Sequence, residues 1–131
     1  MAREDVQTMQ KAYAAFNRAD IPAVMEAMDS QIRWTEPGGG RAPAGTFNGP
    51  ESVANDVFAP VPENFEQFSA DPEAWIDAAH YLAVVGHFRG SAKSGAAVNV
   101  PFVHLWTMRE GKAASFENVV DRDLWTQAWG G

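Results

Sequence analysis

The segment VNVPFVHLWTM, residues 98–108, decides the fold together with the turn REGK, residues 109–112, and the segment AASFENVV, residues 113–120. Both apolar segments are rich in β-branched and aromatic residues, and a glycine-containing turn divides them. This pattern predicts a β-hairpin. We expect the rest of the chain to be organised around it.

The chemistry of the turn leaves two registers for the hairpin. A three-residue loop at 109–111, with Gly111 in the left-handed conformation, is favoured, and it places His104 opposite Phe116. A two-residue turn would instead place His104 opposite Glu117. Because side chains alternate between the two faces of a strand, a slip of one residue changes which residues of the two strands share a face.

The favoured register gathers large apolar side chains and two polar ones on a single face of the hairpin. His104 and Asn118 are the polar pair, and Glu117 lies on the opposite face. A polar pair in an apolar wall is either a hydrogen-bonded core pair or a binding site. The apolar members of this face are Phe102, Trp106 and Phe116, with Val120 continuing it.

The composition restricts the class of protein. With 131 residues, 46% of them apolar, the chain fits a single domain, residues 1–131, with a proper core. A net charge of −7 without a basic patch makes nucleic acid or an anionic membrane a poor partner. Cysteine is absent, which excludes disulfides and cysteine nucleophiles. With no apolar stretch of membrane-spanning length and no signal-like start, we expect a cytoplasmic protein.

Local sequence patterns predict helices first and antiparallel strands afterwards. This order is typical of an α+β domain, with the helices on one face of a curved sheet. Helical spacing and capping residues, or alternating apolar runs, define the individual elements. The expected elements are a helix at 4–18, a helix capped by Asp20, a strand at 31–36, a loop at 41–48, a helix from Pro50 that stops at 60–62, a strand at 65–76 interrupted near Asp71, a strand at 81–91, the hairpin, and a last helix capped by Asp121.

Glu36 lies at the end of a predicted strand, in phase with large apolar residues. Ile32, Trp34 and Glu36 fall on one strand face, so Glu36 faces inward if Trp34 does. Pro37 and the glycines after it end the strand, which places Glu36 at the rim of the core. An exposed rim carboxylate is the alternative interpretation. A carboxylate desolvated inside has a raised pKa and becomes a useful base near neutral pH.

One apolar cavity is expected to hold three candidate polar groups, Glu36, His104 and Asn118. A histidine opposite the carboxylate can donate to a developing oxyanion, which suits proton abstraction next to a carbonyl. His80 and His87 are scattered along the sequence, and no metal-ligand spacing, phosphate loop or serine elbow is present. We therefore expect no metal and no cofactor. The aromatic walls of the cavity are expected to be Trp34, Phe88, Phe102, Trp106 and Phe116.

Four stretches carry a resemblance to a known family. It is the nuclear transport factor 2-like superfamily, in particular its branch of SnoaL-like polyketide cyclases and ketosteroid isomerases. The resemblance implies a cystatin-like cone, in which one strongly curved, mainly antiparallel sheet packs on three helices from the N-terminal half. It also implies a homodimer formed through the outer sheet face. The stretches are AYAAFNRAD (12–20), IRWTEPGGG (32–40), GTFNGP (45–50) and PFVHLWTMREGK (101–112) running on to Asp121.

The resemblance also implies roles for individual residues. Glu36 falls where the isomerase keeps its carboxylate base. His104 falls where the isomerase has an oxyanion-hole aspartic acid, and where the cyclases resemble this chain in having histidine. Asp121 matches an acid/base position of the cyclases. The oxyanion tyrosine of the isomerase aligns with Ala12, and Tyr13, one position later, is retained as a ligand-contacting candidate.

Three functional hypotheses stand side by side. The first is a small isomerase- or cyclase-like enzyme acting on an apolar carbonyl compound, with Glu36 as the base and His104 as the oxyanion donor. Asn118 would orient the ligand, and Asp121 is a second acid/base candidate. The second is a binding protein that holds an apolar, ring-containing ligand without chemistry, and the third is a structural dimer with a filled core. The outer face expected to form the homodimer carries Val85, His87, Val103 and Leu105.

Overall fold

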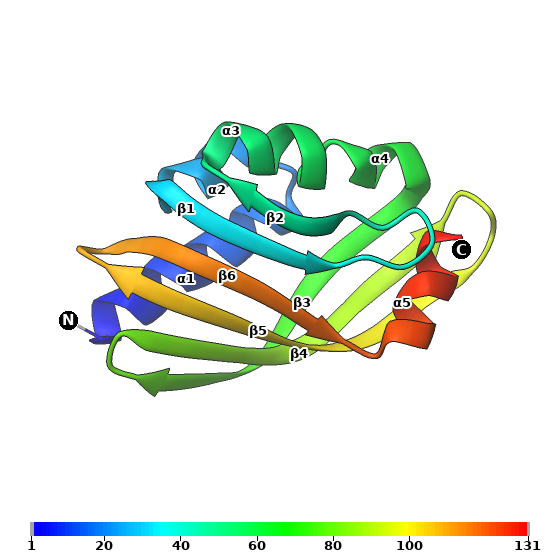
Figure 1. Cartoon of the computed structure of the whole chain (residues 1–131). Helices are drawn as coiled ribbons and strands as arrows, with labels where there is room; N and C mark the ends of the chain where they lie inside the picture. Colours follow the sequence, from blue (N-terminus) through cyan, green and yellow to red (C-terminus); the bar gives the residue numbers. More distant parts are fainter. Residues whose placement is uncertain (1, 131) are drawn as a thin grey trace.

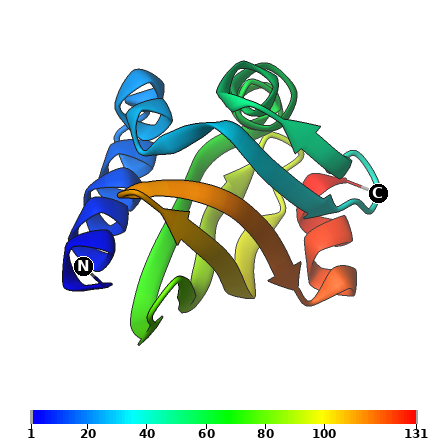
Figure 2. The same cartoon turned by 60° about the vertical axis from the view of Figure 1, so that its left-hand side comes forward.

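Six strands form one strongly curved sheet, which Figures 1 and 2 show from two sides. In this computed structural model, which describes residues 2–130, the strand order across the sheet is β2-β1-β6-β5-β4-β3. Neighbouring strands are antiparallel, apart from β1 and β6, which run parallel. The strands are β1 (Met28–Pro37), β2 (Ala44–Asn48), β3 (Phe65–Ala78), β4 (Tyr81–Ala92), β5 (Ala97–Arg109) and β6 (Lys112–Val120).

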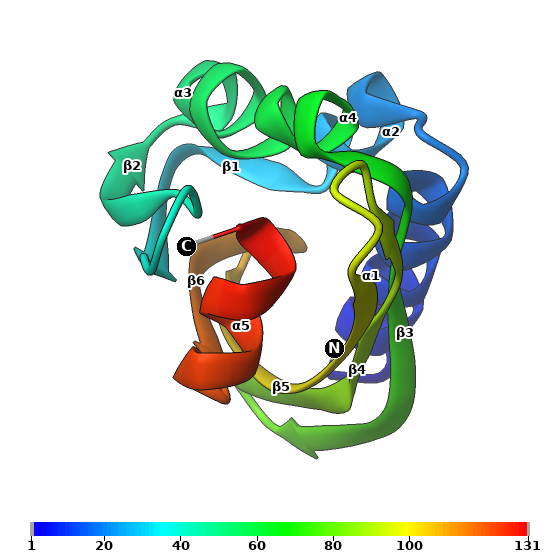
Figure 3. The ribbon, with the colours of Figure 1, turned by 90° about the vertical axis from the view of Figure 1, so that its right-hand side faces the viewer.

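Helices close the curved sheet into a cone. Helices α1 to α4 pack along one side of it, and α5 lies across one end (Figure 3). The predicted α+β class and the meander of the last four strands are both confirmed. Within residues 2–130, no helix has the length and apolar character needed to cross a membrane. The helical elements are α1 (Ala2–Asn17), α2 (Ile21–Glu26), α3 (Pro50–Val53), the π-helical segment η1 (Ala54–Phe58), α4 (Pro60–Asn64) and α5 (Arg122–Trp129).

The hairpin of β5 and β6 closes with a two-residue turn, so the predicted three-residue loop is wrong. Arg109 pairs with Lys112, and the turn residues Glu110 and Gly111 have φ angles of 51° and 77°. Two consecutive positive φ angles give a tight turn whose twist matches that of the flanking strands. Glycine adopts such an angle freely, whereas Glu110 does so at some steric cost.

A β-bulge next to the turn restores the face pattern that the sequence predicts. The register shifts at Met108, and His104 comes to lie opposite Asn118 rather than Phe116. Both His104 and Asn118 are buried, whereas Glu117 is exposed. The prediction that His104 and Asn118 share a face is therefore confirmed, through a bulge that adds one residue to β6.

Several other boundaries differ from the predicted ones. Residues 44–48, expected to lie in a loop, form the edge strand β2 against β1. Pro60 starts α4 instead of ending the helical segment, because the first turn of a helix has no use for the N–H that proline lacks. The expected interruption near Asp71 is a bulge within a continuous β3. The caps predicted at Asp20 and Asp121 are both present.

The outer face of the sheet carries exposed apolar side chains on β3, β4 and β5. Ile76, Tyr81 and Leu105 are 53%, 65% and 45% exposed. Of the residues predicted for this face, Leu105 is the exposed one, and Val85 and Val103 are half-buried. The exposed apolar side chains of this face therefore reach from the β3–β4 turn to β6, where Val119 is 42% exposed opposite Val103.

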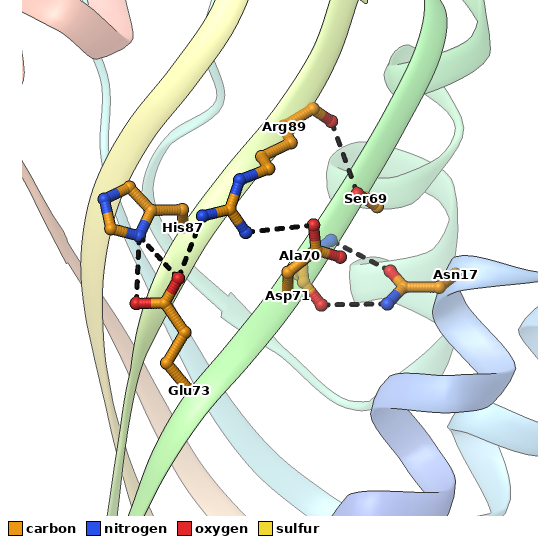
Figure 4. A network of polar contacts seen from close by, with 7 residues as sticks. All are labelled: Asn17, Ser69, Ala70, Asp71, Glu73, His87 and Arg89. Carbon is orange, nitrogen blue, oxygen red and sulfur yellow. Dashed lines mark hydrogen bonds and ion pairs between the residues drawn. The ribbon is translucent and has the colours of Figure 1, made fainter.

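A charged network, formed by Asp71, Glu73, His87 and Arg89, occupies another part of β3 and β4 (Figure 4). Arg89 donates to the Glu73 carboxylate at 2.9 Å, and Nδ1 of His87 lies 3.0 Å from the same carboxylate. Beside this outer charged network, the Asn17 amide bonds to a backbone N–H and C=O of β3, which ties the end of α1 to the sheet.

Candidate active site

The cone encloses an apolar cavity of about 80 Å³. Its lining combines the inner faces of β1, β4, β5 and β6 with side chains of α1 and α5. Among the residues whose burial the structure describes, three polar or charged side chains are fully buried, namely Glu36, His104 and Asn118. All three line this cavity, so the polar groups predicted from the strand phase do converge there.

Glu36 reaches the cavity because of the alternation along β1. Ile32, Trp34 and Glu36 are buried in turn, and β1 ends one residue later at Pro37. The carboxylate accepts two hydrogen bonds, one from the Trp34 indole N–H at 2.6 Å and one from the Asn118 amide N–H at 3.0 Å. Glu36 is 7% exposed, so the alternative of an exposed rim carboxylate is excluded.

The apolar surroundings make Glu36 a weak acid. Burial raises its pKa from 4.5 to about 7, because the charged form loses its hydration. The hydrogen bonds from Trp34 and Asn118 favour the charged form and act in the opposite direction, but they are the smaller effect. Near neutral pH the side chain is therefore close to the midpoint between acid and base, which is the condition for efficient proton transfer.

Tyr13 links α1 to the histidine on β5. The Trp106 indole N–H donates to the Tyr13 hydroxyl at 2.9 Å, and this hydroxyl lies 2.6 Å from Nδ1 of His104. Burial raises the pKa of Tyr13 well above its usual range, so the hydroxyl keeps its proton. An indole N–H can only donate, so the hydroxyl accepts from Trp106 and donates its own proton to His104.

This chain of hydrogen bonds assigns the tautomer of His104. Because Nδ1 accepts from Tyr13, the proton of the neutral ring sits on Nε2. Burial lowers the pKa of His104 to about 3, which keeps the ring neutral; the neighbouring Asn118 side chain acts in the opposite direction and is the smaller effect. Phe102 stacks on the ring with the centroids 3.7 Å apart and fixes its plane. His104 is thus held as a neutral hydrogen-bond donor.

Two atoms of this polar cluster have no hydrogen-bond partner among the described residues. They are Nε2 of His104, a donor, and Oδ1 of Asn118, an acceptor. Asn118 turns its amide N–H toward Glu36, which leaves the amide oxygen free. A buried polar atom without a partner is destabilising, so such a pair indicates a place prepared for a ligand.

The structure assembles most of the predicted cavity residues. Phe102 is an exception, because it lies behind the His104 ring and is not part of the lining. Asp121 is also not brought to the cavity. It is exposed and accepts the Leu124 backbone N–H, which is the capping role that the sequence offered as the alternative. The predicted residues that do line the cavity are Tyr13, Trp34, Glu36, Phe88, His104, Trp106, Phe116 and Asn118.

The site contains contributions that the sequence interpretation missed. Trp125 and Trp129 lie on α5, the helix expected after the Asp121 cap, and both line the cavity although neither was among the predicted site residues. Their spacing of four residues places them on one face of α5, which was the available signal. Among the described residues, no three His, Asp or Glu side chains lie close enough together to hold a metal ion.

The same fold, a curved sheet with helices packed against it, is found in a solved structure of the nuclear transport factor 2-like class and in one described as cystatin-like. Within this class, the chain belongs to the SnoaL-like domain family, whose model matches residues 9–116. Among curated proteins, none matches the chain.

Solved structures extend the comparison over almost the whole chain. A nuclear transport factor 2-like protein of unknown function from Burkholderia pseudomallei is 28% identical, with a TM-score of 0.90 and 98% of each chain covered. TerC, crystallised together with polyporic acid, is 25% identical with a TM-score of 0.89, over 98% of this chain and 99% of TerC. A protein with a ketosteroid isomerase-like fold from Catenulispora acidiphila, in complex with trimethylamine, is 14% identical with a TM-score of 0.79, over 94% and 92% of the two chains.

Proposed function

We propose that this protein is an isomerase- or cyclase-type enzyme that abstracts a proton next to the carbonyl of a small apolar molecule. The observation that carries the proposal is Glu36, a carboxylate buried in an apolar cavity with its pKa raised to about 7. A catalytic base must hold and release a proton at the working pH, and this environment gives Glu36 that property.

In the proposed step one proton leaves a substrate carbon and two electron pairs of the substrate shift. Unprotonated Glu36 takes the proton from the carbon next to the carbonyl, and the C–H electrons form a C=C bond while the carbonyl electrons move to oxygen. The Nε2–H of His104 then donates to this developing enolate oxygen. Where a C=C bond of the substrate is conjugated with the enolate, return of the proton to the far carbon of that bond completes an isomerisation, whereas attack of the enolate carbon on a second carbonyl closes a ring.

Asn118 and Tyr13 support this step without exchanging protons with the substrate. Asn118 holds one oxygen of Glu36 through its amide N–H and offers its Oδ1 to a hydroxyl of the ligand. Tyr13 keeps the Nε2 proton on His104 by donating to Nδ1. We leave Asp121 outside the proposed chemistry, because it caps α5 at the surface.

The similarity to TerC supports a small-molecule occupant of the cavity. That relative was crystallised with polyporic acid, and it covers 98% of this chain at 25% identity. The substrate proposed here is likewise a small organic molecule, and the aromatic lining of Trp34, Phe88 and Phe116 provides the surface that would bury its rings.

A non-catalytic binding protein is the second candidate, and one observation favours it. Both oxygens of Glu36 already accept hydrogen bonds, from Trp34 and Asn118, so the carboxylate also serves as a structural partner inside the cavity. A binder would need the cavity and the polar pair of His104 and Asn118, but no proton transfer.

Proton exchange separates the two candidates. We would incubate the protein with a panel of flat hydroxy- and keto-compounds in D₂O and follow the C–H next to each carbonyl by NMR. The enzyme proposal expects protein-dependent deuterium incorporation into at least one ketone, and its loss in the Glu36→Gln variant. Binding of several compounds without exchange in any of them would establish the binding protein and remove the enzyme.

We also propose that the protein forms a homodimer through its outer sheet face. The exposed apolar side chains of Ile76, Tyr81 and Leu105 support this, because monomeric proteins rarely leave such patches uncovered. Light scattering at micromolar concentration should give twice the chain mass. A monomer under these conditions contradicts the proposal.

A further inference from the structure

Four buried side-chain atoms lack a hydrogen-bond partner in the described part of the chain, two on the sheet and two on helix α5. Two are Nε2 of His104 and Oδ1 of Asn118, on the sheet. The other two are the indole Nε1 atoms of Trp125 and Trp129, on α5. All four residues line the same cavity, so the unpaired polar atoms belong to side chains that surround the space where a ligand is expected.

The two tryptophans belong to the element that closes the cone. In Figure 3, α5 lies across the open end of the curved sheet. Trp125 packs on Phe88 with the ring centroids 4.7 Å apart, and Trp129 meets Phe65 edge-on at 4.9 Å. Both indoles are almost completely buried, at 3% and 4% exposure. Their N–H groups are therefore shielded from water and have no hydrogen-bond partner within the described residues.

We propose that Trp125 and Trp129 form a second anchor for the ligand, so that the natural ligand carries oxygen at two separate positions of an apolar body. One oxygen group binds between His104 and Asn118, and the other accepts a hydrogen bond from the indoles of α5. This inference rests on the proposed small-molecule function of the cavity and specifies the ligand class.

The chemistry of the two anchors differs, which orients the ligand. The pair of His104 and Asn118 offers one donor and one acceptor, so it suits a hydroxyl or an enol. Indole N–H groups only donate, so the α5 anchor takes an acceptor such as a carbonyl oxygen. None of the described lining residues is Lys or Arg, so a neutral acceptor fits this end better than a carboxylate.

The cavity is too small to admit an aromatic ligand unless part of its lining moves. About 80 Å³ is roughly half of the ~150 Å³ that an engineered apolar cavity offers to a benzene molecule. An aromatic ligand must therefore displace part of the lining. The glycine loop after Glu36 packs closely on α5, since a side chain at Gly39 would collide with Thr126. The glycine loop and α5 together form one end of the cone. At this end, the indole N–H groups of Trp125 and Trp129 would donate to an oxygen of the entering ligand.

Two probes of nearly equal shape test the second anchor. 4-Hydroxyacetophenone carries a hydroxyl and a carbonyl at opposite ends of one ring, whereas 4-ethylphenol replaces the carbonyl by a methylene group. We would measure the Kd of both probes for the wild-type protein, for the double variant Trp125→Phe/Trp129→Phe, and for Trp75→Phe. Trp75 is the matched control, because it lies outside the cavity lining.

The wild-type protein should bind the ketone about tenfold more tightly than the ethyl compound, as expected for one net hydrogen bond. The double variant should lose this preference, and Trp75→Phe should keep it. In the wild-type protein, the indole N–H signals of Trp125 and Trp129 should move downfield with the ketone alone. Because this NMR measurement uses only the wild-type protein, it tests the second anchor even if the double variant fails to fold.

Equal affinity of the wild-type protein for the two probes, with indole signals that do not respond, would overturn the second anchor. Failure of both probes to bind at millimolar concentration would also overturn it, together with the proposed ligand cavity. The catalytic proposal fails separately. A clear preference for the ketone, with no deuterium exchange in any compound of the panel, would remove the enzyme and leave the two-anchor ligand in place.

Discussion

The protein contains the same pair of residue types in two regions of one sheet, and the two pairs behave differently. Inside the cone, Glu36 and His104 are buried, with the pKa of Glu36 raised to about 7 and that of His104 lowered to about 3. On the outer face, the hydrogen bond from Arg89 lowers the pKa of Glu73, and His87 lies 3.0 Å from that carboxylate.

The difference shows that surroundings, not residue type, create the candidate base. The outer carboxylate faces solvent and a guanidinium, both of which stabilise its charge. The inner carboxylate has an indole and an amide as donors and an apolar wall around them, so it keeps a proton to a much higher pH. The two regions therefore provide matched variants, in which the same substitution is made inside and outside.

The largest expected effect is on turnover. Glu36→Gln keeps the shape of the side chain and removes its basicity, so it should lower kcat by roughly 10²–10⁴-fold, the usual contribution of a general base. Glu73→Gln, the matched outer substitution, should leave kcat unchanged. The measurement is the rate of deuterium exchange or isomerisation with a ketone that the wild-type protein turns over. Equal rates for the wild type and Glu36→Gln would remove Glu36 as the base.

The second expected effect concerns stability and pH. The pKa of Glu36 is higher in the folded protein than its ordinary value of 4.5, so folding favours the protonated form. Its contribution to stability is complete below about pH 4.5 and is lost as the pH rises through about 7. The gap between these two values corresponds to about 3 kcal/mol.

The protonation of His104 changes stability with pH in the opposite direction, so its effect must be separated from that of Glu36. Its pKa is lowered to about 3 by burial, so its contribution is present above its ordinary pKa of 6.5 and is lost as the pH falls. Glu36→Gln removes only the first dependence. Urea unfolding should therefore show the stability of the wild type, relative to this variant, falling by about 3 kcal/mol between pH 4.5 and 7.5. If the difference in stability between the wild type and Glu36→Gln does not change with pH, Glu36 does not have the raised pKa of a buried carboxylate.

A smaller effect is expected for Tyr13→Phe. The change leaves Nδ1 of His104 and the N–H of Trp106 without their partner, which should lower the free energy of unfolding by about 1–3 kcal/mol. ¹⁵N NMR should also show that His104 no longer holds its proton solely on Nε2. Tyr81→Phe is the control, because Tyr81 is 65% exposed. An unchanged His104 spectrum in Tyr13→Phe would refute the assigned tautomer.

The smallest effect is expected on the outer face. Glu73→Gln removes a carboxylate whose ion pairs with His87 and Arg89 are solvated, so the thermal midpoint should not move measurably at physiological salt. Raising the salt concentration should leave the wild type and this variant equally stable. A clear loss of stability would show that the outer charged network contributes more than exposed ion pairs usually do.

Strand alternation and turn residues predicted much of this structure. The phase of Trp34 and Glu36 placed the carboxylate inside, and the alternation in the hairpin placed His104 and Asn118 on one face. These predictions hold because burial follows the period of a strand. The register was wrong for two reasons. The turn has two residues rather than three, and the bulge that skips Ala114 depends on pairing across the whole hairpin, which sequence near the turn does not reveal.

The tertiary contacts of the site could not be predicted from local patterns. The hydrogen bond between Tyr13 and His104 joins residues 91 positions apart, and the one between Asn118 and Glu36 spans 82. The position of α5 across the cone depends on packing of Trp125 against Phe88, which no periodicity reveals. Spacing along the chain identified the groups, and only the assembled cone showed which atoms remain without partners.

The titration of Glu36 in the free protein tests the central claim most directly. Carboxyl ¹³C NMR, with the Glu36→Gln and Glu73→Gln variants used for assignment, follows the inner and outer carboxylates in the same sample. We predict an apparent pKa of about 7 for Glu36 and a value below 4.5 for Glu73. A Glu36 signal that titrates near 4.5, like a solvated carboxylate, would contradict both the buried base and the proposed chemistry.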